Sequence, residues 1–182
     1  TLRKYLVEGE ESGGSLTDFG HHIIPTYLKN KEDMYAYSFQ GYWRDVGTIE
    51  SLWTASMEII DPEHELNTKA ESWKIYTRNP HTPAIFVAEE GQVSDSIVAD
   101  GAYIAGSVDH SVISHGVQIA ENSQVRDSFI MPGVTIEEDV VIENAIIGEK
   151  SKVAKGASII GSPDAIAVLG YEEEIGGETD EK

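Results

Sequence analysis

The chain has 182 residues, 40% of them hydrophobic, which is enough to build one or two buried cores. The chain has 13 basic and 32 acidic residues, and the net charge of −19 disfavours nucleic acid and anionic membranes as partners. Cysteine is absent, which excludes disulfide frameworks and thiolate zinc sites and is compatible with a cytoplasmic location. No apolar run reaches the ~18 residues of a membrane span, so we expect a soluble protein.

Two helices are predicted before residue 31. The first carries three apolar residues on one face, Leu2, Tyr5 and Leu6. It reads like the end of a helix already under way, so we expect the chain to be a fragment of a longer protein. The second begins at one of three candidate N-caps, Ser15, Thr17 and Asp18. Pro25 is expected in the first turn of its regular part.

Two strands and a third helix are predicted next. MYAYSF, residues 34–39, alternates like a half-buried strand, and GYWRDVGT, residues 41–48, is strand-like and ends at Gly47. Thr48 is the expected N-cap of a helix that Asp61 and the following proline stop. We interpret residues 1–61 as the end of an α/β domain and residues 62–92 as a connector.

The stretch from Ser94 to Gly161 repeats itself. Three blocks begin at Ser111, Ser128 and Ala145, each 17 residues after the one before. Aliphatic residues fall six apart in every block: Ile113, Ile119 and Val125, then Ile130, Ile136 and Ile142, then Ile147, Val153 and Ile159. Neither a helix nor a hairpin has this period, whereas a triangular solenoid with one inward side chain per strand does. We therefore predict a parallel β-helix over residues 93–169, with an acidic, disordered tail at 170–182.

An earlier, atypical coil is predicted from residue 96 to residue 110. Val98, Ile104 and Val108 match the inward positions of the next block, but IAGSV stands where that block has IAENSQV, so two residues are missing. Corners should need positive φ, which Gly, Asn and Asp tolerate. The corner residues of this kind are Gly116, Asn122, Gly133, Asp139 and Gly156.

The densest polar constellation is the segment from Tyr42 to Thr48. A carboxylate that follows a strand and precedes a helix occupies the place where α/β proteins usually bind ligands, and Asp45 offers the hard oxygen that Mg²⁺ prefers. From spacing alone a structural role is favoured, in which Asp45 caps the next helix or pairs with Arg44.

The motifs SLTDFGHHIIP and GYWRDVGTIESLWTASMEII, followed by hexapeptide coils, closely resemble the C-terminal part of the bacterial ADP-glucose pyrophosphorylase family, glucose-1-phosphate adenylyltransferase. The resemblance covers essentially the whole chain. It implies a remnant of a Rossmann-like nucleotidyltransferase domain followed by an all-β, left-handed parallel β-helix built of hexapeptide repeats. It also implies an enzyme that makes ADP-glucose and pyrophosphate from ATP and glucose 1-phosphate for glycogen synthesis.

The resemblance assigns roles to individual residues. In the family two aspartates hold the Mg²⁺ that bridges the substrates, and the second of them maps onto Asp45, which becomes the candidate catalytic and metal-binding residue. Trp43 and Arg44 are candidate substrate-binding residues, and Asp18 is a weaker candidate that a capping role suits better. The family's phosphate loop, first metal aspartate and sugar-phosphate lysine are missing from this sequence, so we expect these 182 residues alone to be inactive.

The resemblance also implies regulation and assembly. Lys150, Lys152 and Lys155 form the only basic cluster of the β-helix and are candidates for an anionic effector, although a solvated face is the favoured interpretation. A homo-oligomer, a tetramer in the family, is expected, with or without a regulatory subunit. Two rival functions stay open: a non-catalytic regulatory or scaffold subunit, and a hexapeptide acyltransferase that would use a histidine such as His110 or His115 as its base.

Overall fold

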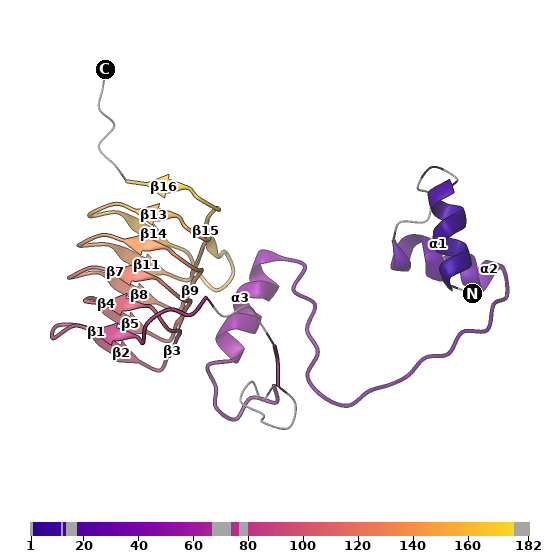
Figure 1. Ribbon diagram of the computed structural model, residues 1–182, viewed down its shortest axis with the longest axis horizontal. Helices are drawn as coiled ribbons and strands as arrows, with labels where there is room; N and C mark the ends of the chain where they lie inside the picture. The colour runs from indigo at the N-terminus through magenta and orange to yellow at the C-terminus, as the bar shows by residue number, and fades with distance from the viewer. Residues whose placement is uncertain (1, 12, 14–17, 67–73, 77–79, 177–182) are drawn as a thin grey trace, which may run out of the picture. The chain divides into compact units, whose positions relative to one another are not determined.

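The computed structural model describes residues 2–11, 13, 18–66, 74–76 and 80–176. They form two compact units, Thr1–Gln40 and Gly41–Lys182 (Figure 1). None of the helices in these ranges is both long and apolar enough to cross a membrane.

The first unit is a small helical cluster made of α1 (Leu2–Glu11), η1 (Phe19–Ile23) and α2 (Ile24–Lys29). Tyr5 is its centre and is only 5% exposed, while its ring centroid lies 4.6 Å from that of Tyr27. The Tyr5 hydroxyl donates to Glu32 Oε1 at 2.8 Å and accepts from Asn30 Nδ2 at 2.9 Å. Of the three apolar residues predicted to share a face of the first helix, Tyr5 is the buried one, whereas Leu2 and Leu6 are exposed.

Two predictions about the second helix are confirmed. Asp18 is the N-cap, because its Oδ1 accepts a hydrogen bond from the backbone N–H of His21 at 2.6 Å. The first turn is a π-turn, in which the N–H of Ile23 bonds to the carbonyl of Asp18 at 3.0 Å, and Pro25 then opens the regular α2. The other two candidate caps, Ser15 and Thr17, lie outside the described residues.

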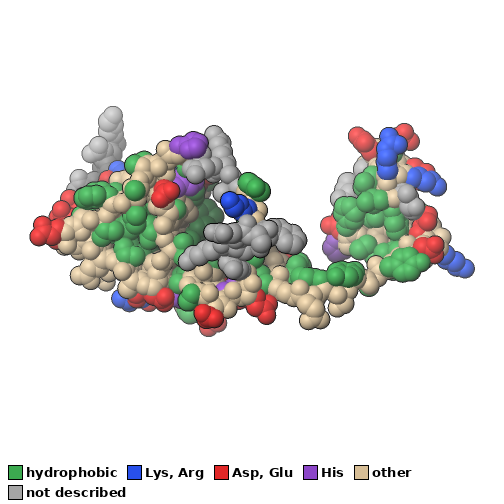
Figure 2. Space-filling view, turned by 60° about the horizontal axis from the view of Figure 1, so that its bottom comes forward, with side chains coloured by type: hydrophobic (Ala, Val, Ile, Leu, Met, Phe, Trp, Pro, Cys, Tyr) green, Lys and Arg blue, Asp and Glu red, His purple; other side chains and the backbone are tan. Residues whose placement is uncertain are grey.

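The two strands predicted at 34–39 and 41–48 do not form. Both segments are extended but unpaired, and a strand needs a neighbour to bond its backbone groups; the described part of the chain offers none. Hydrophobic side chains of the first segment lie open to solvent instead (Figure 2), and Tyr35 and Tyr37 are 92% and 90% exposed. The alternating sequence of residues 34–39 therefore indicates a propensity to form a strand, but no neighbouring strand pairs with it in the described residues.

The third predicted helix is present as α3 (Ile49–Glu58). Thr48 is its N-cap as expected, and a capping box joins Thr48 to Ser51: the Thr48 Oγ1 accepts from the Ser51 N–H at 3.2 Å, and the Ser51 Oγ accepts from the Thr48 N–H at 3.1 Å. The helix lies against strand β9 of the β-helix (Figure 1), where the Trp53 indole donates to a backbone carbonyl.

Residues 86–175 form a parallel β-helix with three sheets. The first sheet, in spatial order, consists of β1 (Phe86–Val87), β4 (Tyr103–Ile104), β7 (Gln118–Ile119), β10 (Thr135–Ile136), β13 (Lys152–Val153) and β16 (Glu174–Ile175). The second consists of β2 (Gln92–Ser94), β5 (Ser107–Asp109), β8 (Gln124–Arg126), β11 (Val141–Glu143) and β14 (Ser158–Ile160). The third consists of β3 (Ile97–Val98), β6 (Val112–Ile113), β9 (Phe129–Ile130), β12 (Ala145–Ile147) and β15 (Ala167–Leu169).

The predicted register of the coils is confirmed. On the first sheet Ile104, Ile119, Ile136 and Val153 pair in sequence, and these four side chains are at most 1% exposed. The other two ladders pair as predicted as well: Val108, Val125, Ile142 and Ile159 on one sheet, and Val98, Ile113, Ile130 and Ile147 on the other. The six-residue period therefore places one aliphatic side chain of every strand inside the solenoid.

The corners also behave as predicted. The residues expected there have φ between +60° and +74°: Gly116, Asn122, Gly133, Asp139 and Gly156. A second column of positive φ, at Asp95, His110, Asp127 and Asn144, was not predicted and lies between the second and third sheets. Its polar residues occupy conformations in which most side chains are strained.

The strands extend past both expected limits of the β-helix. They begin at Phe86 because Val87 and Val93 already keep the six-residue spacing, and they continue to Ile175. Residues 174–175 belong to the segment expected to be disordered, but they pair with Lys152 and Val153 to form β16. Residues 177–182 of that predicted tail lie outside the described residues.

Candidate functional site

The segment Tyr42–Thr48 leads into α3 without forming a strand or helix of its own. Tyr42 is half-buried, whereas the next residue, Trp43, is 71% exposed. Tyr42 and Arg44 both contact Glu58 at the end of α3. Trp43 and Asp45, in contrast, are exposed to solvent, and neither bonds to Glu58 within the described part of the chain.

Glu58 holds the inner side of this segment. The Tyr42 hydroxyl donates to Glu58 Oε2 at 2.8 Å, and Arg44 donates from Nε to the same oxygen at 3.1 Å and from Nη2 to Oε1. Burial acts to raise the pKa of Glu58, but the hydrogen bonds from Tyr42 and Arg44 outweigh it, and the pKa lies below its usual value. The carboxylate is thus ionised at neutral pH and binds the guanidinium as a fork.

Asp45 has neither of the structural roles that its position allowed. Thr48 caps α3 in its place, and Arg44 pairs with Glu58. The carboxylate of Asp45 is exposed and accepts one short-range hydrogen bond, from the Gly47 N–H to Oδ1 at 3.2 Å. The carboxylate therefore keeps acceptor capacity that a metal ion could use.

The surroundings of Asp45 suit a metal site in which the protein supplies few of the ligands. Among the residues that the structure describes, no group of three or more His, Cys, Asp or Glu side chains could hold a metal ion. A closed protein cage is therefore not formed by these residues. Mg²⁺ is commonly held by one or two carboxylates together with substrate phosphates, and a single exposed carboxylate suits that arrangement.

Two family models match the chain, and together they span both of its parts. Residues 3–62 match the family described as nucleotidyl transferase, and residues 82–165 match the family described as GlmU-like, C-terminal hexapeptide. The chain therefore joins a segment that matches the nucleotidyl transferase family, which we call the nucleotidyl transferase segment, to a β-helix that matches the hexapeptide family. Asp45, Trp43 and α3 all lie in the nucleotidyl transferase segment.

Asp18 lies in the same matched segment but in the other compact unit. Its carboxylate caps η1, and the hydrogen bond from the His21 N–H holds its pKa below the usual range. The capping role is confirmed, while a contribution of Asp18 to substrate binding stays a prediction. His22 is also used locally, since its Nδ1 accepts from the Asp18 N–H at 3.2 Å.

The lysines of the hexapeptide β-helix are already paired with carboxylates. Lys150 lies 3.6 Å from Glu149 and 3.7 Å from Glu172. The other two have two carboxylate partners each, Glu137 and Glu174 for Lys152 and Glu138 and Asp139 for Lys155. An anionic effector would have to compete with these six groups, so the geometry favours a structural role for all three lysines.

His110 is the histidine of the β-helix with a defined partner. Its Nδ1 lies 2.6 Å from Asp127 Oδ1, with the His110 side chain 40% exposed. A carboxylate in this position orients the ring as in a general base. The backbone carbonyl of Asp127 also receives Trp53, which equally suits a role in fixing this corner.

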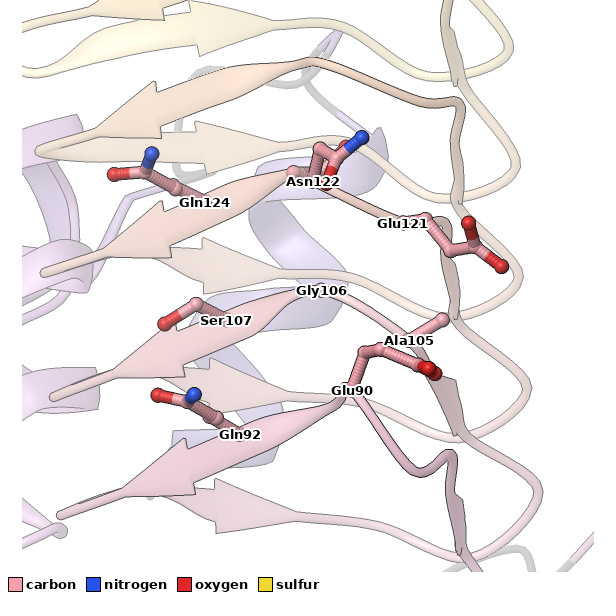
Figure 3. A pocket seen from close by; sticks show the side chains of 9 residues that line it. Glu90, Gln92, Ala105, Gly106, Ser107, Glu121, Asn122 and Gln124 are labelled. Carbon is pink, nitrogen blue, oxygen red and sulfur yellow. The ribbon is translucent and has the colours of Figure 1, made fainter.

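A polar recess opens where the early coil is two residues short (Figure 3). It has a volume of about 360 Å³, and Figure 3 shows Gln92, Ser107 and Gln124 one above the other along its wall. Glu90 and Glu121 stand at its corner side, and their side chains have no hydrogen-bond or ion-pair partner among the described residues. The sequence shows that this coil is two residues shorter than the next one, but the presence of a recess was not predicted from it.

Sequence reasoning also missed Glu58. Nothing local marks it, since it lies 14 residues after Arg44 and 16 after Tyr42 and looks like any acidic residue of a surface helix. Only the return of α3 past the extended segment brings the three side chains together.

Proposed function

We propose that this chain is the C-terminal portion of a glucose-1-phosphate adenylyltransferase, an ADP-glucose pyrophosphorylase that acts in the cytoplasm in glycogen synthesis. The nucleotidyl transferase match and the hexapeptide match, in that order, support the general class of enzyme. The observation that carries the proposal is Asp45, whose carboxylate is exposed and unused by either structural partner in the motif that resembles the family's metal motif.

In the proposed reaction an oxygen of glucose 1-phosphate attacks the α-phosphorus of ATP, a new P–O bond forms, and the bond to pyrophosphate breaks. Asp45 would hold one side of the Mg²⁺ ion, and Trp43 beside it would contact a substrate. Bound Mg²⁺ neutralises charge on the reacting phosphates. The chain's own contribution is orientation, because alignment of the two substrates supplies much of the acceleration.

The remaining catalytic groups would come from the part of the enzyme that carries the phosphate loop. In this proposal the β-helix serves assembly into a homo-oligomer, with or without a regulatory subunit, and transmits control by an anionic effector. Because Lys150, Lys152 and Lys155 are paired with carboxylates, the proposal does not depend on them.

Formation of ADP-glucose from ATP and glucose 1-phosphate tests the proposal. In the full-length enzyme Asp45→Asn should lower turnover a hundredfold or more, about 3 kcal/mol of transition-state stabilisation. Asp61→Asn is a matched control, since Asp61 is also exposed and accepts from a backbone N–H two residues on, at 2.9 Å. Residues 1–182 alone should form no ADP-glucose. Normal turnover in Asp45→Asn would overturn the assignment.

Assays on the same full-length protein also test the two rival functions. The His110–Asp127 pair favours acyl transfer as a second candidate, and acetyl transfer from acetyl-CoA that Asp127→Asn abolishes would establish it. A regulatory or scaffold subunit would bind its catalytic partner yet form no ADP-glucose as the full-length protein.

A further inference from the structure

We propose that Glu58 is a positioning residue, which directs Asp45 and Trp43 toward the substrate side by binding Tyr42 and Arg44. The inference rests on the proposed role of Asp45 as a magnesium ligand. It adds a residue that does not itself touch metal or substrate.

The contacts of Glu58 account for both of its oxygens. Oε2 accepts from the Tyr42 hydroxyl at 2.8 Å and from Arg44 Nε at 3.1 Å, and Oε1 accepts from Arg44 Nη2. The ring of His64 packs edge-on against Tyr42, 4.5 Å between centroids, and closes another side of the cluster. Three donors converging on one carboxylate fix two alternate residues of an extended segment.

Tyr42 and Arg44 flank Trp43, and Arg44 directly precedes Asp45. The bonds of Tyr42 and Arg44 to Glu58 therefore restrict the backbone that carries Trp43 and Asp45. Tyr42 is half-buried, while Trp43, at 71% exposed, and Asp45 are left open to solvent. No sheet pairing holds the segment in the described residues, so the direction of Asp45 depends on these side-chain bonds.

Glu58 is itself held on a fixed element. It is the last residue of α3, and the residue before it, Met57, is 7% exposed. One turn and a half earlier the Trp53 N–H bonds to the Asp127 carbonyl on the β-helix at 2.8 Å. The β-helix thus supports α3, α3 presents Glu58, and Glu58 orients the segment that carries Asp45.

Removing a group that bonds a metal ligand directly typically weakens metal binding 10- to 100-fold. Glu58 acts one step further away, through Tyr42 and Arg44, so we expect an effect at the low end of this range. Glu58→Gln keeps the size of the side chain but loses the charge and turns an amide N–H₂ toward Arg44. The apparent Mg²⁺ concentration for half-maximal rate should rise about tenfold or more. A purely structural role would reduce the amount of active protein and leave this midpoint where it was.

The experiment uses the full-length enzyme with 5-fluorotryptophan, so that the ¹⁹F resonance of Trp43 reports the segment without metal or substrate. Glu58→Gln should shift the Trp43 resonance and raise the Mg²⁺ midpoint. Glu50→Gln is the matched control on the same helix, because the Glu50 side chain is exposed and has no partner among the described residues, and it should do neither. Tyr42→Phe removes one hydroxyl and should act in the same direction with a smaller effect, which keeps the test valid if Glu58→Gln folds poorly.

The outcomes separate the inference from the proposed function. If Asp45→Asn removes activity but Glu58→Gln and Tyr42→Phe match Glu50→Gln in both readouts, Glu58 is not a positioning residue. If the full-length protein forms no ADP-glucose, the proposed function is wrong. If Asp45→Asn leaves ADP-glucose formation intact, only the proposed role of Asp45 as a magnesium ligand is wrong. In both cases the Trp43 resonance still decides whether Glu58 orients the segment.

Discussion

The indole N–H of Trp53 donates to the backbone carbonyl of Asp127, 74 residues later in the chain, at 2.8 Å. This bond joins α3 to a corner of the β-helix where φ of Asp127 is +46°. The same residue binds His110 through its side chain. Trp53 therefore connects the nucleotidyl transferase segment to the solenoid at a corner that is already fixed by polar contacts.

Trp53→Phe should destabilise the protein by about 1 kcal/mol, because an aromatic ring is kept at this position but the Asp127 carbonyl loses its hydrogen-bond donor. Trp43→Phe is the control, since Trp43 is 71% exposed and its change should stay within about 0.5 kcal/mol. Urea unfolding followed by circular dichroism measures both. Equal stabilities for the two variants would mean that α3 is not anchored by this bond.

The β-helix could be predicted from the sequence because its period is independent of distant residues. Each inward residue, such as Ile119, Ile136 or Val153, is set by the six-residue spacing and by its neighbours one coil away. The helix α3 was predictable for a similar reason, since Thr48 and Ser51 cap it locally.

The predicted strands and the orientation of the site depend on partners that are distant in the sequence. Residues 34–39 alternate like a strand, but alternation does not supply a neighbouring strand, and the described segment is unpaired. Asp45 was expected between a strand and a helix; the helix α3 is present and the strand is not. The pairing of Arg44 with Glu58 was not predictable, because it needs the path of α3. Local patterns fix periodic elements, and tertiary contacts decide which side chains are left free.

The shortened coil makes Gly106 irreplaceable for a steric reason. A Cβ at this position would lie 2.4 Å from the Ser123 carbonyl oxygen and 2.8 Å from that of Ala120, and neither backbone atom can move freely. Gly106→Ala should therefore cost about 1 to 3 kcal/mol. Ser107→Ala, at the next residue along the wall of the recess, should cost about 0.5 kcal/mol or less. Thermal unfolding compares them, and a harmless Gly106→Ala would show that the coils are further apart than the structure has them.

Glu137 gives a pH-dependent prediction. Hydrogen bonds from Lys152 Nζ at 2.8 Å and from the Lys155 N–H at 2.9 Å hold its pKa below the usual value. Because the folded-state pKa is lowered, its contribution to stability is present above the unfolded value of about 4.3 and is lost as the pH falls through the folded value.

The stability difference between the protein and Glu137→Gln should therefore be seen at neutral pH and shrink below about pH 4. Glu121→Gln serves as the control, since the Glu121 side chain has no partner among the described residues. Denaturant melts over a series of pH values test the difference, and ¹³C titration of the Glu137 carboxyl tests its cause. If this stability difference instead grows as the pH falls, the interaction does not lower the pKa of Glu137 and the prediction is wrong.

The last prediction concerns the inner ladder of the β-helix. Ile136 is 1% exposed and pairs with Ile119 on one side and Val153 on the other, so coils enclose it from both directions. Ile136→Ala should leave a cavity with little room to collapse, at a cost of about 2 to 5 kcal/mol.

Glu138 lies two residues away on the outside of the same coil. Its ion pair with Lys155 at 2.6 Å is exposed, with side-chain exposures of 53% and 61%, and such pairs contribute little because water and salt screen them. Glu138→Ala should therefore cost about 0.5 kcal/mol or less. A one-residue slip would exchange inner and outer positions, so comparable losses in the two variants, or a larger loss at Glu138, would show that the ladder runs through different residues.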